Sequence, residues 1–224
     1  MEYKKILNDI ILSNNAVEEF YNNYNGEFKK WIDDIIPEIN DCIKQEQINP
    51  WHKYNVMDHI LHSVEEINKQ TTNLSEKDRI LLSFVMFFHD IGKPSCHIRR
   101  IVDGKDRDSF FNHNIASEKI ARRVLIKLYD DNAFTNVICK LVFKHDIFMF
   151  IKDFPNKNPH WRRLTPKLIE EEINDLNLVG DGYNLMRYLI MVGRADNKAQ
   201  NELMTKDSLK MLDKCDKILD QIKK

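Results

Sequence analysis

The apolar segment from Ile80 to Phe88 ends directly in the pair His89-Asp90. A stretch this apolar is usually buried, and charged side chains are seldom buried without a partner or a metal. The pair offers an imidazole nitrogen and a carboxylate oxygen to the same small volume. Further candidate ligands of the same residue types lie elsewhere in the chain: His59, His113, His145 and Asp196. This set favours a metal-dependent hydrolase.

Apolar residues recur at helical spacing through most of the chain, which has only six glycines and six prolines in 224 residues. Ser75 opens a capping-box-like sequence before the helix that ends at His89-Asp90, and Thr135 is expected to cap the helix that ends at His145. We therefore predict an all-α fold. The stripes that support it are Val56, Ile60, Val64 and Ile67; Ile120, Val124 and Leu128; Leu185, Leu189 and Val192; and Leu209, Leu212 and Leu219.

The pattern divides the chain into three parts. Residues 1–47 are expected to form an N-terminal extension of two helices, the second of which Pro37 ends or kinks. Residues 48–202 form the main domain, and residues 203–224 form a C-terminal helix packed on it. One domain with a helical extension fits a chain of this length.

Two stretches read as loops. In the first, residues 94–112, Asp103-Gly104 favours the turn of a short hairpin. The second, residues 153–166, holds three prolines and a basic-aromatic cluster. We expect no strand outside the first loop.

Charge and cysteine content narrow the class of protein. The net charge of -1 gives the protein no global positive field, so the net charge does not support RNA as a partner. A local basic patch is nevertheless compatible with this net charge. No apolar run approaches membrane-spanning length and no signal peptide is recognised, so we expect a cytoplasmic protein with no membrane association. The four cysteines have no CxxC pair and read as free thiols in a reducing compartment: Cys42, Cys96, Cys139 and Cys215.

Imidazole and carboxylate ligands suit manganese, iron, nickel, cobalt or zinc, and magnesium where water completes the shell. One or two ions fit the set, and a metal lowers the pKa of bound water from 15.7 to roughly 7. Lys93, three residues after His89-Asp90, is placed to hold a phosphate or to stabilise charge on a leaving oxygen. The sequence is equally consistent with Arg162 and Arg163 forming a phosphate clamp and with both lying in an ordinary surface loop.

Several segments together resemble the HD-domain phosphohydrolase superfamily, and most closely the HD domain of bacterial tRNA nucleotidyltransferases. The resemblance covers roughly residues 48–202, with Asn-His-Asn around His113 where that family usually has Gly-His-Glu. The segments that carry it are Asn49 to His59, His89 to Pro94, Phe110 to Ser117, Trp161 to Arg163 and Arg194 to Gln200.

The resemblance implies an HD-domain helical bundle with phosphatase or 2',3'-cyclic phosphodiesterase activity on a nucleotide or related small phosphoester. It does not extend to tRNA end addition, because the chain lacks the Gly-Gly motif with paired aspartates. By resemblance, Asp90 bridges two metals, the first held by His59, His89 and Asp196 and the second by His113 and His145. The remaining assignments are Asp90 and Lys93 as catalytic residues, and His52, Lys93, Arg162 and Arg163 as substrate-binding residues.

Two other classes stay open at this point. A non-catalytic HD-fold sensor or scaffold is opposed by the intact ligand set, because degenerate relatives usually lose ligands. An HD-type di-iron oxygenase is opposed by Lys93 and by the match to a phosphohydrolase branch.

Overall fold

The computed structural model describes residues 2–154 and 159–222. Its secondary structure is almost entirely helical, which confirms the predicted all-α class. The α-helices are α1 (Glu2–Leu12), α2 (Ala16–Asn23), α3 (Gly26–Ile35), α4 (Glu38–Lys44), α5 (Val56–Gln70), α6 (Glu76–Phe88), α7 (His113–Leu128), α8 (Asn132–Lys144), α9 (Pro166–Leu176), α10 (Gly182–Lys198) and α11 (Glu202–Ile222).

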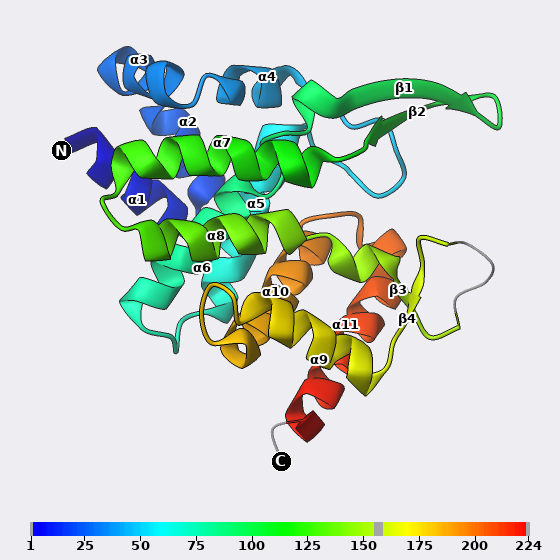
Figure 1. Ribbon diagram of the computed structural model, residues 1–224. Coiled ribbons are helices and arrows are strands. Elements are labelled where there is room, and N and C mark those ends of the chain that lie inside the picture. The colour runs from blue at the N-terminus through cyan, green and yellow to red at the C-terminus, as the bar shows by residue number, and fades with distance from the viewer. Residues whose placement is uncertain (1, 155–158, 223–224) are drawn as a thin grey trace.

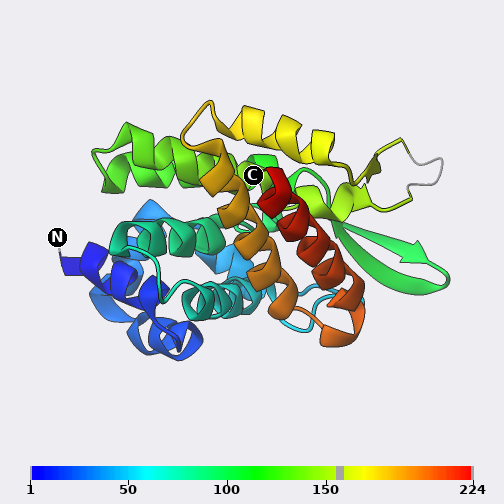
Figure 2. The same ribbon diagram turned by 90° about the horizontal axis from the view of Figure 1, so that it is seen from below.

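The helices pack as a bundle around α5, α6 and α10. Helices α7 and α8 lie side by side, with α3 and α4 along one edge of the molecule and α9 to α11 along the other (Figure 1). Figure 2 shows α10 in the middle, between α11 on one side and α5 and α6 on the other. One buried apolar cluster runs from α1 to α11, so the N-terminal helices share the core of the main domain.

The two helices that lead to the first candidate ligands both begin at a side-chain cap, and the one at Ser75 was predicted. The Asn55 side chain accepts a hydrogen bond from the Asp58 backbone N–H at 2.8 Å and caps α5. Ser75 caps α6 in the same way, through the Asp78 N–H at 3.2 Å. Every residue from Leu81 to Phe88 is buried, so α6 delivers His89 and Asp90 to the interior.

The N-terminal extension has four helices where two were predicted. The apolar stripe of the first helix continues past Leu12, but the chain turns at Ser13 and restarts as α2. A second break occurs at Gly26, whose φ of +49° is a left-handed conformation that glycine adopts without strain. Pro37 separates α3 from α4, so its predicted role as a helix end is confirmed.

The predicted cap at Thr135 is wrong. Helix α8 begins one turn earlier, where the Asp131 carboxylate accepts a hydrogen bond from the Phe134 N–H at 2.9 Å. A carboxylate is favoured there because it also meets the positive end of the helix dipole. Thr135 lies inside the helix and is buried.

The predicted hairpin is present as β1 (His97–Val102) and β2 (Lys105–Phe110), paired antiparallel. Asp103 and Gly104 both have positive φ, at 52° and 71°, as a two-residue type I′ turn requires. The expectation of no other strand is wrong, because β3 (Ile151–Lys152) and β4 (Arg162–Arg163) form a short parallel pair. Residues 155–158 of the predicted second loop lie outside the described residues.

Two short 3₁₀ helices, η1 (Pro94–Cys96) and η2 (Ile147–Phe150), follow the ends of α6 and α8. The last helix, α11, packs along α10 and α9, with Arg194 paired to Asp213 and to Asp216. No helix in the described part of the chain is long and apolar enough to cross a membrane.

Candidate metal centre

Five helices bring the six predicted ligands to one buried place. His59 lies within α5, His89 and Asp90 follow α6, and His113 is the first residue of α7. The remaining two are His145, which directly follows α8, and Asp196, in the last turn of α10. Helix ends are suited to this role because a ligand there can turn inward without interrupting the backbone hydrogen bonds of the helix.

The first half of the cluster combines two imidazoles with two carboxylates. The Nε2 atom of His59 lies 3.0 Å from Oδ1 of Asp196 and 3.2 Å from Oδ2 of Asp90. The Nε2 atom of His89 lies 3.3 Å from the same Asp90 oxygen and 3.3 Å from the His59 nitrogen. His59, His89 and Asp196 thus form one group able to hold a cation.

The second half uses the other oxygen of Asp90. Nε2 of His113 lies 3.2 Å from Asp90 Oδ1, and Nε2 of His145 lies 3.7 Å from it. The two imidazole nitrogens are 3.1 Å apart. The carboxylate of Asp90 therefore faces one histidine pair with each oxygen, which is the arrangement of a bridging ligand.

Three of the histidines are oriented from behind by backbone carbonyls. Nδ1 of His89 faces the Met86 oxygen at 2.6 Å, and Nδ1 of His145 faces the Val142 oxygen at 2.7 Å. His113 is held in the same way by the Phe110 oxygen at 2.8 Å. A carbonyl only accepts, so Nδ1 carries the proton and Nε2 points into the cluster, as metal-binding histidines are normally held.

These positions fit a transition metal. Nitrogen and oxygen ligands bound to one ion at about 2.0–2.2 Å are roughly 3–3.5 Å apart, which is the spacing found here. Several electron-rich atoms also converge without an intervening solvent layer, which is costly unless a cation or a proton lies among them.

The charge state of the cluster supports the same conclusion. Burial opposes the charged form of His89, but the negative charge of Asp90 and a hydrogen bond with Asp196 outweigh it and raise the pKa of His89 to about 10. Burial likewise opposes ionised Asp90, yet the charges of His89 and Lys93 hold its pKa well below the usual value. Burial lowers the pKa of His145 to about 4. In the absence of metal, a proton on His89 thus takes the place of the cation.

The sequence matches the HD domain family over residues 52–181. This match spans more than half of the chain. The chain belongs to the HD-domain family. No curated protein matches it. The matched range holds five of the six clustered residues, and Asp196, on α10, lies beyond it.

In this HD domain Lys93 is buried beside Asp90. Its Nζ atom donates to Asp90 Oδ2 at 2.6 Å, to Gln47 Oε1 at 2.8 Å and to His52 Nε2 at 3.1 Å. An ammonium group has three N–H donors, so these acceptors use all of them. An entering phosphate oxygen must therefore replace one acceptor, and His52 makes the longest of the three contacts.

Gln47 is the residue of this site that sequence reasoning missed. It is 6 % exposed and also donates to the Tyr54 carbonyl at 3.2 Å. An uncharged amide at the end of the predicted N-terminal extension carries no signal of chemistry. Its one cue is its position, five residues before His52 at the start of the family match.

His52 is held with its Nε2 atom toward Lys93. Its Nδ1 lies 2.8 Å from Asn49 Oδ1, an acceptor, so Nδ1 carries the proton. Burial, and then the charge of Lys93, keep the pKa of His52 well below its usual value, so the ring is neutral. His52, His59 and Asp90 also form a group of metal-ligating type, but the Lys93 ammonium lies between His52 and Asp90 and disfavours a cation there.

Arg162 and Arg163 lie on β4, and both are already engaged. Arg162 is paired with Glu172 at 2.5 Å and with Glu171 at 3.3 Å, and its guanidinium is therefore neutralised. Arg163 lies over the Phe154 ring, 5.6 Å from its centroid. Of the two, Arg163 is the one without a carboxylate partner among the described residues.

Proposed function

We propose that this HD domain is a metal-dependent phosphohydrolase that acts on a nucleotide or a related phosphoester. It would bind one or two divalent transition metals, with His59, His89, Asp90 and Asp196 at the first site. Asp90, His113 and His145 would hold the second. The proposal is supported by family membership and by the buried cluster of imidazoles and carboxylates.

One observation carries most of the argument. The two oxygens of Asp90 face separate histidine pairs, at 3.2 Å from His59 and 3.2 Å from His113. A single carboxylate placed in this way can join two ions, and paired ions stabilise the attacking and leaving oxygens of a phosphoryl transfer.

The protein's own groups would divide the remaining tasks. A bound metal supplies an acidified water at neutral pH. Lys93 would turn one N–H from His52 to a non-bridging phosphate oxygen, while Asp90 and Gln47 keep the ammonium in place. His52, neutral and with Nε2 released, would then accept a hydrogen bond from a substrate hydroxyl. Both groups act inside the buried pocket, where electrostatic interactions are strong.

The finer substrate assignment rests on the motifs. The resemblance to the HD module of tRNA nucleotidyltransferases favours phosphomonoesters and 2',3'-cyclic phosphodiesters of nucleosides. Arg163 would bind the phosphate of the substrate, because a guanidinium group binds phosphate through two donors. Arg162 would have to leave Glu172 to do the same, which makes it the weaker candidate.

A panel of nucleoside monophosphates and cyclic phosphodiesters, assayed with protein that is chelated and then reloaded with manganese, nickel or zinc, tests the proposal. We expect phosphoester hydrolysis that needs metal and disappears in Asp90→Asn. Asp207→Asn, which removes a carboxylate that is 95 % exposed on α11, is the matched control and should retain full activity.

Metal bound at full stoichiometry without hydrolysis of any panel member would support a sensor or scaffold instead. Oxygen consumption by the iron-loaded protein, without phosphate release, would support the oxygenase.

A further inference from the structure

The β1–β2 hairpin extends from the helical body between η1 and α7, the helix that begins with the candidate ligand His113 (Figure 1). It has only two strands, and such a hairpin is marginally stable by itself. Its apolar residues are poorly covered, with Ile98 46 %, Val102 45 % and Ile101 76 % exposed. The hairpin therefore needs an anchor to the rest of the fold, and its exposed surface is available to a partner.

The anchor is Asp108, whose side chain is fully buried. It accepts hydrogen bonds from the Ile48 N–H at 2.8 Å and from Arg99 Nε at 2.9 Å, and lies 2.8 Å from His97 Nε2. The Asp108 N–H in turn donates to the Ile48 carbonyl at 2.8 Å. Ile48 follows Gln47, so the hairpin is joined to the segment that holds Lys93.

The two faces of the hairpin differ sharply in charge. Side chains alternate along a strand, so cross-strand partners share a face. The face of His97, Arg99 and Ile101 contains the carboxylates of Asp106 and Asp108. The opposite face, which we call the basic face, holds three cations and no carboxylate: Ile98, Arg100, Val102, Lys105, Arg107 and Ser109.

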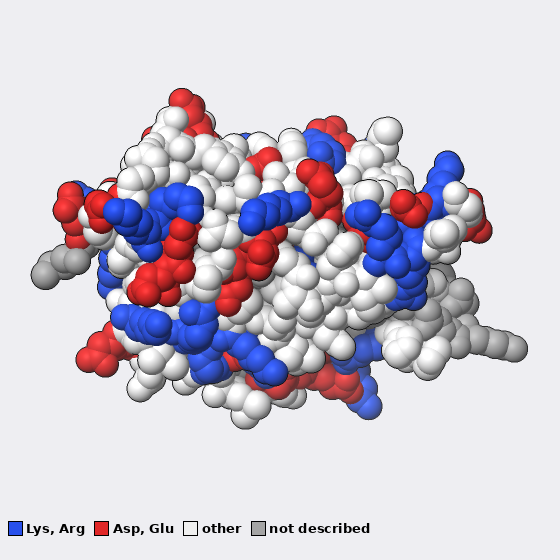
Figure 3. Space-filling view, turned by 90° about the horizontal axis from the view of Figure 1, so that it is seen from above, with Lys and Arg blue, Asp and Glu red and all other residues white. Residues whose placement is uncertain are grey.

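The register of the basic face places two cations against each other. Arg100 is directly opposite Arg107, and like charges in such a pair are destabilising. No ion pair is formed by Arg100, Lys105 or Arg107 with any described residue, whereas Arg99 on the other face is paired with Asp108. Figure 3 shows Lys and Arg side chains gathered at the right of the view, where the hairpin lies. An anion on this face would relieve the repulsion.

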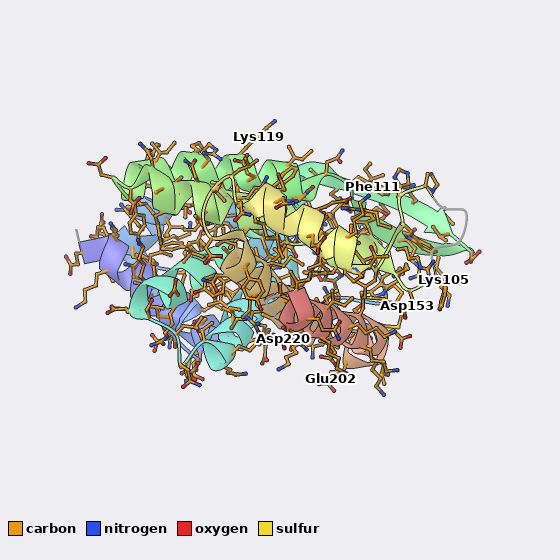
Figure 4. All side chains as sticks on the ribbon, turned by 60° about the horizontal axis from the view of Figure 1, so that its bottom comes forward. Lys105, Phe111, Lys119, Asp153, Glu202 and Asp220 are labelled. Carbon is orange, nitrogen blue, oxygen red and sulfur yellow. The ribbon has the colours of Figure 1, made fainter. Side chains whose placement is uncertain are left out.

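An exposed aromatic ring continues the basic face toward the metal centre. The Arg100 guanidinium lies over the Phe111 ring, 4.7 Å from its centroid, and Phe111 is 59 % exposed. Phe111 precedes the candidate ligand His113 by two residues, and Figure 4 shows it near the start of α7, with Lys105 toward the far end of the hairpin. Cations and an aromatic ring thus follow one another from the hairpin tip to the turn just before α7, which begins with His113.

We propose that the basic face binds the phosphate backbone of a single-stranded nucleic acid and directs its end to the metal centre. Arginine grips phosphate through paired donors, and an exposed ring offers a stacking platform for an unpaired base. A single strand is favoured over a duplex because stacking on Phe111 needs an unpaired base. Only the delivery of the end for hydrolysis rests on the proposed function, and binding itself does not.

Fluorescence anisotropy of an oligouridylate of about 12 nucleotides, with chelator present, measures binding apart from hydrolysis. Three phosphate contacts predict a salt slope near -2, so affinity should fall about tenfold between roughly 50 and 150 mM salt. Oligothymidylate of the same length should bind equally, because the proposed contacts are made to phosphates and ring faces.

The triple variant R100Q/K105Q/R107Q should abolish the salt-dependent binding without lowering the thermal midpoint, since it removes a like-charge pair. The control K30Q/K69Q/K210Q makes the same change in net charge at three exposed lysines on other elements and should bind as the wild type does. Arg107→Gln alone should flatten the salt slope by about one third.

The proposal is overturned if the oligouridylate does not bind at low salt or if both triple variants lose affinity equally. Equal binding of polyglutamate, which has charge but no bases, would also overturn it in favour of an acidic protein partner. Oligonucleotide binding without hydrolysis of any phosphoester would leave this proposal standing and contradict the proposed function.

Discussion

Asp90 is the residue on which both halves of the candidate centre depend. Its Oδ2 is shared by His59, His89 and Lys93, and its Oδ1 faces His113 and His145. The carboxylate stays ionised because cationic neighbours outweigh the cost of burial. Losing it should therefore cost more than losing any single histidine.

We predict that Asp90→Asn binds no metal, whereas His145→Ala keeps one ion per chain. Activity should fall by more than about 100-fold in Asp90→Asn, since even residues behind the ligands contribute roughly 10–100-fold. Elemental analysis of the purified variants measures the difference. Equal metal content in the two variants would refute the bridging role.

Gln47 should matter for turnover without touching the metal. Gln47→Leu removes one of the three acceptors of the Lys93 ammonium and leaves a buried donor unpaired, at a cost of about 1–3 kcal/mol in unfolding free energy. We expect reduced kcat at normal metal content. Gln45→Leu is the matched control, because among the described residues the Gln45 side chain hydrogen-bonds only the Glu46 carbonyl. Loss of metal in Gln47→Leu would show that the residue only supports the fold.

At the scale of elements, the site depends on how closely α7 approaches the turn after α6. Gly92 donates its backbone N–H to Ser117 Oγ at 2.9 Å. A Cβ atom at this position would lie 2.5 Å from the Ser117 nitrogen and 2.7 Å from the His113 oxygen. These are backbone atoms, so the two elements can accommodate a side chain only by moving apart.

Gly92→Ala is therefore expected to destabilise the fold by about 1–3 kcal/mol and to displace His113 from Asp90. Chemical denaturation and metal content measure the two effects. Gly104→Ala controls for the loss of a glycine, because a Cβ atom at this position in the hairpin turn would have no neighbouring heavy atom within 4 Å. It should leave metal binding unchanged even though its positive φ adds strain. Normal metal binding by Gly92→Ala would contradict the close-packing argument.

The sequence predicts the helices that carry ligands because each has a strong apolar stripe and a recognisable start or end. The cap at Ser75 and the turn at Asp103-Gly104 depend on local chemistry, which can be recognised in the sequence. The misplaced cap at Thr135 arose because Asp131 is an equally good local choice.

Long-range contacts are different. Two of the three bonds of Lys93, to His52 and Gln47, and the bond of Asp108 to Ile48 join residues that are 41, 46 and 60 positions apart, so no spacing rule reveals them. The meeting of six ligands was predictable in kind, from residue type and motif order. The separate direction of the two Asp90 oxygens is implied by the family resemblance but not by spacing, because it depends on how α7 and α8 pack.

At the scale of the whole molecule, the centre concentrates charge inside a bundle whose core is largely apolar. In metal-free protein the pKa of His89 is about 10, above its value of about 6.5 in an unfolded chain. Its contribution to stability is fully present below about pH 6.5 and is lost as the pH rises through about 10. The lowered pKa values of Asp90 and Asp196 have the opposite effect on the pH dependence of stability. The stability that these two carboxylates contribute is lost as the pH falls below about 4.

Metal must displace the proton on His89, so its binding should tighten as the pH rises. We predict that the stabilisation by added zinc or manganese grows between about pH 6.5 and 8.5, while the chelated protein loses stability over the same interval. Denaturant titrations with metal and with chelator give both curves. If the stabilisation by added metal instead decreased as the pH rose, this linkage would be contradicted.

The most direct test of the central claim is anomalous diffraction from a crystal grown with manganese. We predict one density peak among His59, His89, Asp90 and Asp196, and a second among Asp90, His113 and His145 when both sites fill. The absence of a peak touching Asp90, or bound metal only at other residues, would contradict the central claim.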